Sequence, residues 1–291
     1  MAGKTILITG VSSGFGRLAV PLLLRRGHTI LAGIRGGEAR LRALYGADHA
    51  DAIAGGRLVA VDLHMDRPES FAAVRQRIDA DHGGRLDVLV NNAGYGLLAP
   101  VEDMGEAEIR KQMEVNFFGP TLLATALLGP LRAARGRILN VTSVAGLMSF
   151  PYYGVYSASK SALECVTDAW RTELAPFGVQ VGLVEPGGYR TEFTATALSR
   201  AAGQAPEGSL YAARTREFAA FLGDAERKAA GDPGVVARRI ARLCDVRRVP
   251  MRTLCGPDAW GLSLLRRILP FGWRAWIVDL VFRRVIFRGA F

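Results

Sequence analysis

Short apolar runs alternate with longer helical segments along the first two thirds of the chain. Several of the runs are β-branched and apolar throughout, as strands covered on both faces are. This alternation is typical of repeated βαβ units, which build a parallel sheet with a cleft at the carboxyl ends of its strands. Six strands are predicted here: Thr5–Thr9, Thr29–Ile34, Arg57–Val61, Leu86–Val90, Gly136–Thr142 and Val179–Glu185.

Helices are predicted between these strands and after them. The four in the first part are at 15–26, 66–82, 106–132 and 155–177. Residues 192–230 form a mostly helical insertion that should cover the cleft. A last short strand is expected near Met251–Leu254, followed by an Arg- and Trp-rich amphipathic tail at 256–291.

These elements predict one α/β domain over residues 1–291. The expected fold is a Rossmann-like doubly wound parallel sheet of about seven strands, with helices on both faces and a helical C-terminal extension.

Positive charge is concentrated near the C-terminus. The formal net charge is +10, and residues 231–291 contain twelve Arg and no Lys against four Asp. Such an excess can attract an anionic membrane surface or nucleic acid, because both present phosphates. A solvated basic surface is the alternative that we favour, and no nucleic-acid partner is expected.

The remaining composition indicates a cytoplasmic protein without a metal site. The three cysteines form no C-x-x-C pair and are interpreted as reduced thiols, while the four histidines lack ligand-like spacing. No secretory signal precedes the first strand. The longest uncharged stretch, Val115–Leu131, contains two prolines and is interpreted as a buried or subunit-facing helix.

A glycine-rich turn follows the first predicted strand, with the sequence Thr9-Gly10-Val11-Ser12-Ser13-Gly14-Phe15-Gly16. Glycines let the backbone approach a pyrophosphate closely, and the helix that follows presents free N–H groups to it. A strand-to-helix turn without a ligand would look the same, so this motif alone is weak. A P-loop is disfavoured because no Gly-Lys-Ser/Thr follows.

Further motifs follow along the chain at positions that are expected to lie at the cleft. They are Asn91-Asn92-Ala93-Gly94, Asn116, Ser143, Tyr156-x-x-x-Lys160, and Pro186-Gly187 followed by Thr191. Together with the turn, these residues resemble the short-chain dehydrogenase/reductase family over Lys4 to Thr191. The segment Tyr95-Gly96-Leu97-Leu98 is similar to the retinol and hydroxysteroid dehydrogenase branch. The resemblance implies an oxidoreductase that interconverts an alcohol and a carbonyl compound with NAD(P)(H). Residues 1–191 would then form the cofactor-binding and catalytic core.

The resemblance also implies roles for individual residues. Catalysis would use Asn116, Ser143, Tyr156 and Lys160. Besides Tyr156 and Lys160, the cofactor would contact Gly10, Ser12, Ser13, Gly14, Phe15, Gly16, Arg35, Asp62, Leu63, Asn91, Ala93, Gly94, Pro186, Gly187, Tyr189 and Thr191. Tyr189 departs from the smaller aliphatic residue often found there, so its side chain is expected near the substrate.

The chemistry of these residue types agrees with such roles. Tyr156 and Lys160 lie four residues apart and share a helix face, although the same spacing occurs on ordinary amphipathic helices. A nearby ammonium favours the phenolate of a tyrosine, whose ordinary pKa is about 10. A hydroxyl such as that of Ser143 can stabilise charge on a carbonyl oxygen. The resemblance gives Asn116 the task of holding a water in a proton relay to Lys160.

The choice of cofactor and the class of substrate can be specified further. Ile34 stands where an acidic residue would pair with the ribose of NAD, and Arg35 can meet a 2′-phosphate, so NADP(H) is preferred over NAD(H). An apolar wall suggests a lipophilic substrate, contacted by Tyr95, Ser143, Leu147, Tyr153, Tyr189 and Phe193.

Three expectations concern partners and alternative functions. Val115–Leu131 and the helix with Tyr156 predict a homodimer or homotetramer. The amphipathic tail would enclose substrate or make peripheral contact with a membrane surface, although packed core is the commoner explanation of such a stripe. A non-catalytic NAD(P)-binding redox sensor or scaffold protein is the alternative function, and an epimerase or dehydratase is a further one.

Overall fold

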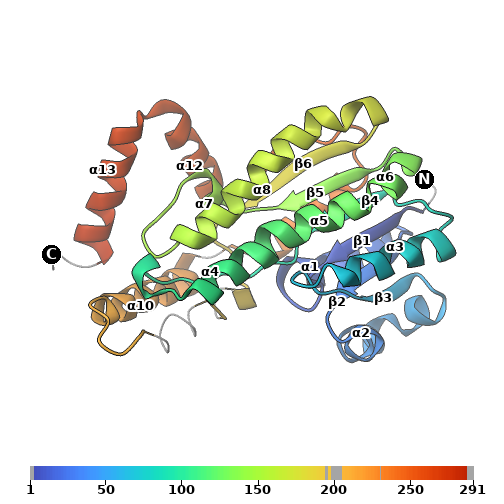
Figure 1. Cartoon of the computed structure of the whole chain (residues 1–291), viewed down its shortest axis with the longest axis horizontal. Helices are drawn as coiled ribbons and strands as arrows, with labels where there is room; N and C mark the ends of the chain where they lie inside the picture. The colour runs from blue at the N-terminus through green and yellow to red at the C-terminus, as the bar shows by residue number, and fades with distance from the viewer. Residues whose placement is uncertain (1–2, 194–195, 198–204, 230, 287–291) are drawn as a thin grey trace.

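The computed structural model describes residues 3–193, 196–197, 205–229 and 231–286 (Figure 1). These residues contain a sheet of seven parallel strands in the order β3-β2-β1-β4-β5-β6-β7. The chain adds strands on one side of β1 and then on the other, which opens a ligand crevice at the carboxyl ends beside β1 and β4. The strands are β1 (Thr5–Thr9), β2 (Thr29–Ile34), β3 (Leu58–Asp62), β4 (Val88–Asn91), β5 (Arg137–Val141), β6 (Gln180–Pro186) and β7 (Arg252–Cys255).

Helices cover both faces of the sheet, so the predicted doubly wound fold is confirmed. Ile6 and Ile8 of β1 pack on one face against α1 (Gly14–Arg25), α2 (Gly37–Ala54) and α11 (Gly234–Leu243). Leu7 points to the opposite face, which α3 (Glu69–Asp81), α5 (Gly119–Ala126) and α8 (Gly154–Glu173) cover. This alternation of side chains is what the two-residue period of a strand imposes.

The predicted helix at 106–132 is divided in the structure. It consists of α4 (Glu106–Met113), the π-helical turn η2 (Glu114–Phe118), α5, and α6 (Leu128–Ala134). Pro120 begins α5, and the backbone leaves helical geometry at Leu127, just before the second Gly-Pro pair. Proline lacks the N–H that a continuous helix needs, which explains why the segment is not straight.

Helix α2 was not predicted. Its apolar positions are sparse, since only Leu41, Tyr45, Ala52 and Ile53 are buried, and the backbone is non-helical at His49. Such a segment lacks the regular apolar stripe by which helices are recognised.

The remaining elements connect the strands and helices described above or extend the chain beyond β7. They are η1 (Val101–Asp103), α7 (Val144–Leu147), η3 (Ala175–Phe177), α10 (Ala212–Ala229), α12 (Pro257–Ile268), α13 (Phe271–Val281) and η4 (Phe282–Ile286). α12 packs against α7 and β7, and η4 returns to α10. α12 and α13 therefore form a helical extension that stands out from the sheet (Figure 1).

Among the described residues, no single helix is long and apolar enough to cross a membrane. Glu106–Ala126 and Leu128–Ala134 meet that test together by length and composition, with a bend of 55° between them.

Candidate active site

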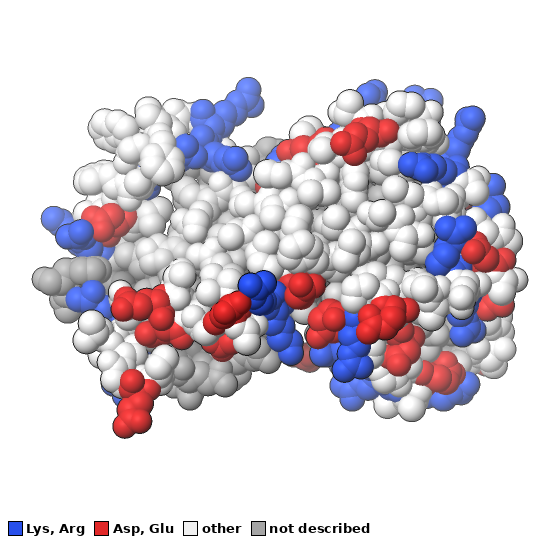
Figure 2. All heavy atoms as spheres, viewed as in Figure 1, with Lys and Arg blue, Asp and Glu red and all other residues white. Residues whose placement is uncertain are grey.

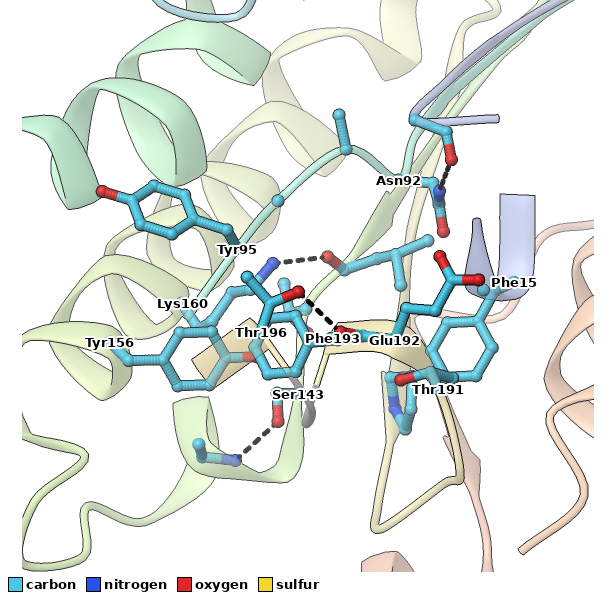
Figure 3. A pocket seen from close by; sticks show the side chains of 18 of the residues that line it. Phe15, Asn92, Tyr95, Ser143, Tyr156, Lys160, Thr191, Glu192, Phe193 and Thr196 are labelled. Atoms are coloured by element: carbon cyan, nitrogen blue, oxygen red, sulfur yellow. Dashed lines mark hydrogen bonds between the residues drawn. The ribbon is translucent and has the colours of Figure 1, made fainter. Parts of the chain in front are cut away.

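A cavity of about 720 Å³ opens at the carboxyl ends of the strands. It extends from the turn after β1, past the start of α8, to α10 and the end of α13. In Figure 3, Phe15 after β1, Tyr156 of α8 and Phe193 after β6 point into one space. Residues far apart in the sequence thus meet where ligands of α/β sheets bind.

The turn after β1 is shaped to hold a phosphate group. Gly10 has a φ of +69°, and a Cβ on it would lie 2.8 Å from the Cα of Ala93. Asn92 Nδ2 donates to the carbonyl oxygens of Thr9 and Gly10 at 2.9 and 3.1 Å. The end of β4 therefore braces this turn, and α1 begins immediately after it, with its free N–H groups at the cavity.

Most of the predicted cofactor residues line the cavity. They are Gly10, Ser12, Ser13, Gly14, Phe15, Arg35, Leu63, Ala93, Gly94, Tyr156, Lys160, Pro186, Gly187, Tyr189 and Thr191. These residues fit a dinucleotide, because the glycine turn can cradle a pyrophosphate while Tyr156 and Lys160 stand at the other end.

Three predicted cofactor residues, Asp62, Asn91 and Gly16, do not line the cavity. Asp62 accepts a hydrogen bond from the backbone N–H of Gly36 at 3.0 Å and so holds the loop that carries Arg35. Asn91 is buried between strands. Gly16 packs so closely under the turn that a Cβ there would meet the carbonyl oxygen of Gly10 at 2.4 Å.

Tyr156, Lys160 and Ser143 converge at the inner part of the cavity (Figure 3). Tyr156 and Lys160 come from successive turns of α8, and Ser143 caps the N-terminus of α7, where its Oγ accepts from the Ala145 N–H at 3.2 Å. The Ser143 hydroxyl lies close enough to the Tyr156 phenol to act against the effect of burial on its pKa. The Lys160 ammonium lies 5.9 Å from the centre of the Tyr156 ring.

Asn116 stands behind this group, in the π-helical turn η2. Its Oδ1 accepts from the Tyr95 N–H at 3.1 Å, and its Nδ2 donates to the Tyr95 carbonyl and to Ser159 Oγ at 2.9 and 3.1 Å. A Cβ on Gly94 would lie 3.2 Å from Asn116 Oδ1 and 3.3 Å from Lys160 Nζ. The amide and the ammonium therefore face the same narrow space, and π-turns often mark functional positions of this kind.

Burial shifts the pKa values of Tyr156 and Lys160 on α8. It raises the pKa of Tyr156 above its ordinary value, against the opposing effect of the Ser143 hydroxyl, so the phenol is neutral near pH 7. Burial lowers the pKa of Lys160 to about 8, and the carboxylate of Glu164 opposes that shift. Perturbed groups in a cleft are typical of acid/base chemistry.

A buried ion cluster lies behind the same helix. Arg252 Nη1 contacts Glu164 Oε2 at 2.9 Å and Glu185 Oε1 at 2.6 Å, and its Nη2 contacts Asp168 at 3.1 Å. Burial, together with Glu164, raises the pKa of Glu185 to about 7. One arginine thus neutralises carboxylates from α8 and β6.

Hydrogen bonds also fix α8 to the strands beneath it. Asn91 Nδ2 donates to Asn140 Oδ1 at 2.8 Å, and Asn140 Nδ2 donates to Thr167 Oγ1 at 2.8 Å. All three side chains are buried. β4, β5 and α8 are therefore connected through side chains as well as through packing.

The outer part of the cavity is aromatic. Five predicted substrate residues line the cavity as a whole, namely Tyr95, Ser143, Tyr153, Tyr189 and Phe193. The Phe193 ring lies 5.4 Å from the Tyr156 ring. Leu147, also predicted, is buried in α7 and does not line the cavity.

Sequence reasoning missed a second set of lining residues, which are Phe218, Phe221, Leu222, Val281 and Phe282. Phe218 and Phe282 stack with ring centres 5.9 Å apart, joining α10 to η4. The insertion at 192–230 and the tail were expected to cover the cleft and enclose substrate, but the sequence did not indicate which of their apolar side chains would face the cavity.

Residues 4–202 match the short chain dehydrogenase family. The chain belongs to this family. It is accordingly an oxidoreductase, as the resemblance of its motifs implied. Across the described residues, no group of three or more His, Cys, Asp and Glu side chains is arranged to hold a metal ion.

Similar proteins extend over nearly the whole chain. A 3-ketodihydrosphingosine reductase from Bacteroides thetaiotaomicron is 34% identical over 88% of this chain and 89% of its own. A short-chain dehydrogenase from Streptomyces avermitilis has a TM-score of 0.75 at 31% identity, covering 99% and 98% of the two chains. A short-chain dehydrogenase from Burkholderia cenocepacia, solved in complex with NADP, shares the fold at 23% identity and a TM-score of 0.72 over 95% and 98%.

Proposed function

We propose that this dehydrogenase uses NADP(H) to interconvert a lipophilic primary or secondary alcohol and the matching aldehyde or ketone. The observation that carries the proposal is that Tyr156, Ser143 and Lys160 line one cavity, which has an aromatic outer part. The cavity volume of about 720 Å³ is typical of small-molecule sites.

A bound nicotinamide would supply or accept the hydride. In reduction, Tyr156 donates the proton to the substrate oxygen, and its raised pKa keeps that proton in place at neutral pH. Ser143 donates a hydrogen bond to the same oxygen as negative charge develops on it. Lys160 holds positive charge beside the phenol and binds ribose hydroxyls, and Asn116 holds the water through which Lys160 is reprotonated.

Arg35 supports the preference for NADP(H). It follows β2 at the edge of the cavity, where Ile34 takes the place of an acidic residue. A guanidinium there can make charge-assisted hydrogen bonds to a 2′-phosphate. Position 34 has no carboxylate that would repel this phosphate. The Burkholderia structure, which contains NADP, agrees with this choice.

The aromatic side chains support a lipophilic substrate. Tyr153, Phe193, Phe218 and Phe282 line the end of the cavity beyond Tyr156. Binding against such a wall is favourable because it removes apolar surface of the ligand from water. The same wall offers few hydrogen-bond partners to the hydroxyls of a sugar. The name of the Bacteroides relative, a reductase of a sphingosine-type ketone, agrees with it.

Assembly and location belong to the same proposal. η2 exposes Phe118 and α5 exposes Leu122, while α8 exposes the small side chains of Ala158, Cys165 and Ala169. Figure 2 shows a largely uncharged band across this face of the molecule. A homodimer or homotetramer that pairs these helices would cover the band. The enzyme would work in the cytoplasm, in contact with a membrane surface through its tail.

The test compares turnover of a long-chain ketone with that of a short one, using NADPH. Wild-type protein should reduce the long-chain ketone with the higher kcat/KM. Tyr156→Phe should lose about 100-fold or more of that activity while NADPH still binds, because only the proton donor is removed. Tyr211→Phe is the matched control, since Tyr211 is a tyrosine on the surface near α10.

Two results would contradict the proposal. A Tyr156→Phe variant with a tenth or more of wild-type activity would remove the acid/base assignment. NADPH binding without turnover of any carbonyl compound would favour the redox sensor or scaffold protein instead.

A further inference from the structure

The helices α12 and α13 with the turn η4 form what we call the C-terminal arm, residues 257–286. Within the arm, Ala259 and Phe282 are the buried residues that the structure describes. Large apolar side chains are exposed along the rest: Trp260, Leu264, Ile268, Phe271, Trp273, Trp276 and Val281. The first three are spaced at i, i+4 and i+8, so they form a single stripe along α12.

This exposure separates the arm from an ordinary core helix. Trp273 and Trp276 are 62% and 56% exposed, and their rings lie 6.4 Å apart in an edge-to-face pair. Contiguous apolar surface of this kind is rare on a soluble monomer and marks a site of interaction.

Basic side chains accompany the apolar ones. The arm contains Arg266, Arg267, Arg274, Arg283 and Arg284 against Asp258 and Asp279, and Asp279 is already paired with Arg283. Figure 2 shows uncharged atoms over most of the arm, with basic groups at its edges. Tryptophan and arginine around an apolar surface match the interface of an anionic bilayer, where indole rings lie at the headgroups and guanidinium groups meet lipid phosphates.

A second copy of the chain is a poorer partner for this surface. A two-fold contact would place two arms of like charge against each other, which is unfavourable. The uncharged band over α5 and α8 is better suited to self-association, because it contains few arginines.

The arm is also part of the cavity wall. Val281 and Phe282 line the cavity, and Phe282 packs with Tyr152 and Phe218 while Val278 covers them. The same short segment thus has exposed apolar neighbours on one side and the aromatic end of the active site on the other.

We propose that the arm docks the enzyme on an anionic membrane surface and brings the aromatic end of the cavity to the bilayer. A lipophilic substrate then passes between the lipid and the cavity beside Val281 and Phe282. The docking stands on the arm alone, whereas the passage of substrate rests on the function proposed above.

The docking is tested with the full chain and vesicles. The protein should float with vesicles that contain phosphatidylglycerol, bind those of phosphatidylcholine alone at least tenfold more weakly, and dissociate as salt is raised. Trp273→Ser combined with Trp276→Ser should weaken binding by about tenfold or more. Phe177→Ser is the matched control, because Phe177 is an aromatic residue, 50% exposed, outside the arm. Arg266→Gln with Arg267→Gln gives a second variant that keeps the apolar surface.

Each possible result supports or contradicts docking of the arm on a membrane. Equal binding to neutral and anionic vesicles, no binding at all, or unchanged binding of both double variants would overturn it. A change from dimer to monomer in the tryptophan variant, without loss of vesicle binding, would assign the arm to a second copy and would also overturn it.

Kinetics separate the docking from the proposed function. With a long-chain ketone dissolved in phosphatidylglycerol vesicles, the double tryptophan variant should lose about tenfold in kcat/KM, yet reduce a small water-soluble ketone at the wild-type rate. Vesicle binding without turnover of any ketone would keep the docking and remove the function. An equal loss with both ketones would overturn the passage of substrate through the arm.

Discussion

Lys160 Nζ donates a hydrogen bond to the carbonyl oxygen of Val141 at 3.1 Å. This bond joins the middle of α8 to the last residue of β5 and orients the ammonium toward Tyr156. Glu164, one helical turn further along α8, is the carboxylate that opposes the effect of burial on the pKa of Lys160. The charge of the lysine therefore depends on a residue outside the cavity.

The first prediction follows from that dependence. Burial sets the pKa of Lys160 at about 8, so its positive charge is lost as pH rises through this value and reductase activity should fall there. Glu164→Gln removes an influence that raises this pKa, so the fall should begin at lower pH. The dependence of kcat/KM on pH measures the shift. Asp168→Asn, which removes a different carboxylate beside Arg252, is the control, and an unchanged profile in Glu164→Gln would refute the coupling.

The second prediction concerns Arg35. Arg35→Ala should raise KM for NADPH by about tenfold or more and change KM for NADH little, because a charge-assisted contact to the 2′-phosphate is lost. Arg25→Ala, near the far end of α1, should alter neither value. An equal effect on KM for both cofactors would show that Arg35 does not bind the 2′-phosphate of NADPH.

The third prediction concerns the ion cluster. Arg252→Met leaves Glu164 and Glu185 buried without a counter-charge and should lower the free energy of unfolding by about 3 kcal/mol at pH 8. Because burial already raises the pKa of Glu185 to about 7, the folded state binds its proton more tightly than the unfolded state. Glu185 therefore opposes folding increasingly as pH rises from 4.5 to about 7, where the effect levels off, so the loss should be smaller at pH 5 than at pH 8.

Urea unfolding at the two pH values measures this effect. Adding Glu185→Gln to Arg252→Met should restore part of the stability, since one buried charge is removed. Arg248→Met, at a nearby exposed arginine, should cost little. A loss in Arg252→Met that is equal at pH 5 and pH 8 would contradict the account.

The fourth prediction concerns self-association. Leu122→Glu places a charge in the uncharged band on α5 and should convert the oligomer to a monomer. Leu18→Glu is a close control, because Leu18 on α1 is 41% exposed and Leu122 is 42% exposed. Sedimentation velocity at micromolar concentration distinguishes the two variants, and a dimer that persists in Leu122→Glu would place the interface elsewhere.

Much of the fold and of the inner site could be predicted because the signals are local. The strands are continuous apolar runs, and Thr9 to Gly16 carries its glycines in a single short segment. The π-turn at Asn116 and the helix α2 could not be predicted. The first depends on contacts with Tyr95 and Ser159, and the second has too few buried positions to produce a period.

The residues of the outer cavity were harder to predict from the sequence. Phe218 and Phe282 are 64 residues apart, and only the folded chain brings their rings together. For Leu147, closeness in sequence to a site residue was misleading. It lies only four residues after Ser143, yet the short helix α7 directs it into the interior.

The chain of hydrogen bonds from Asn91 through Asn140 to Thr167 has a consequence for the geometry of catalysis. Each residue of a helix advances about 1.5 Å along its axis, so sliding α8 by a single residue would break the bond to Thr167 inside the protein. The distance between Ser143 at the end of β5 and Tyr156 on α8 is therefore set in the core. The reacting groups are in position before any ligand arrives, and binding need not spend free energy to align them.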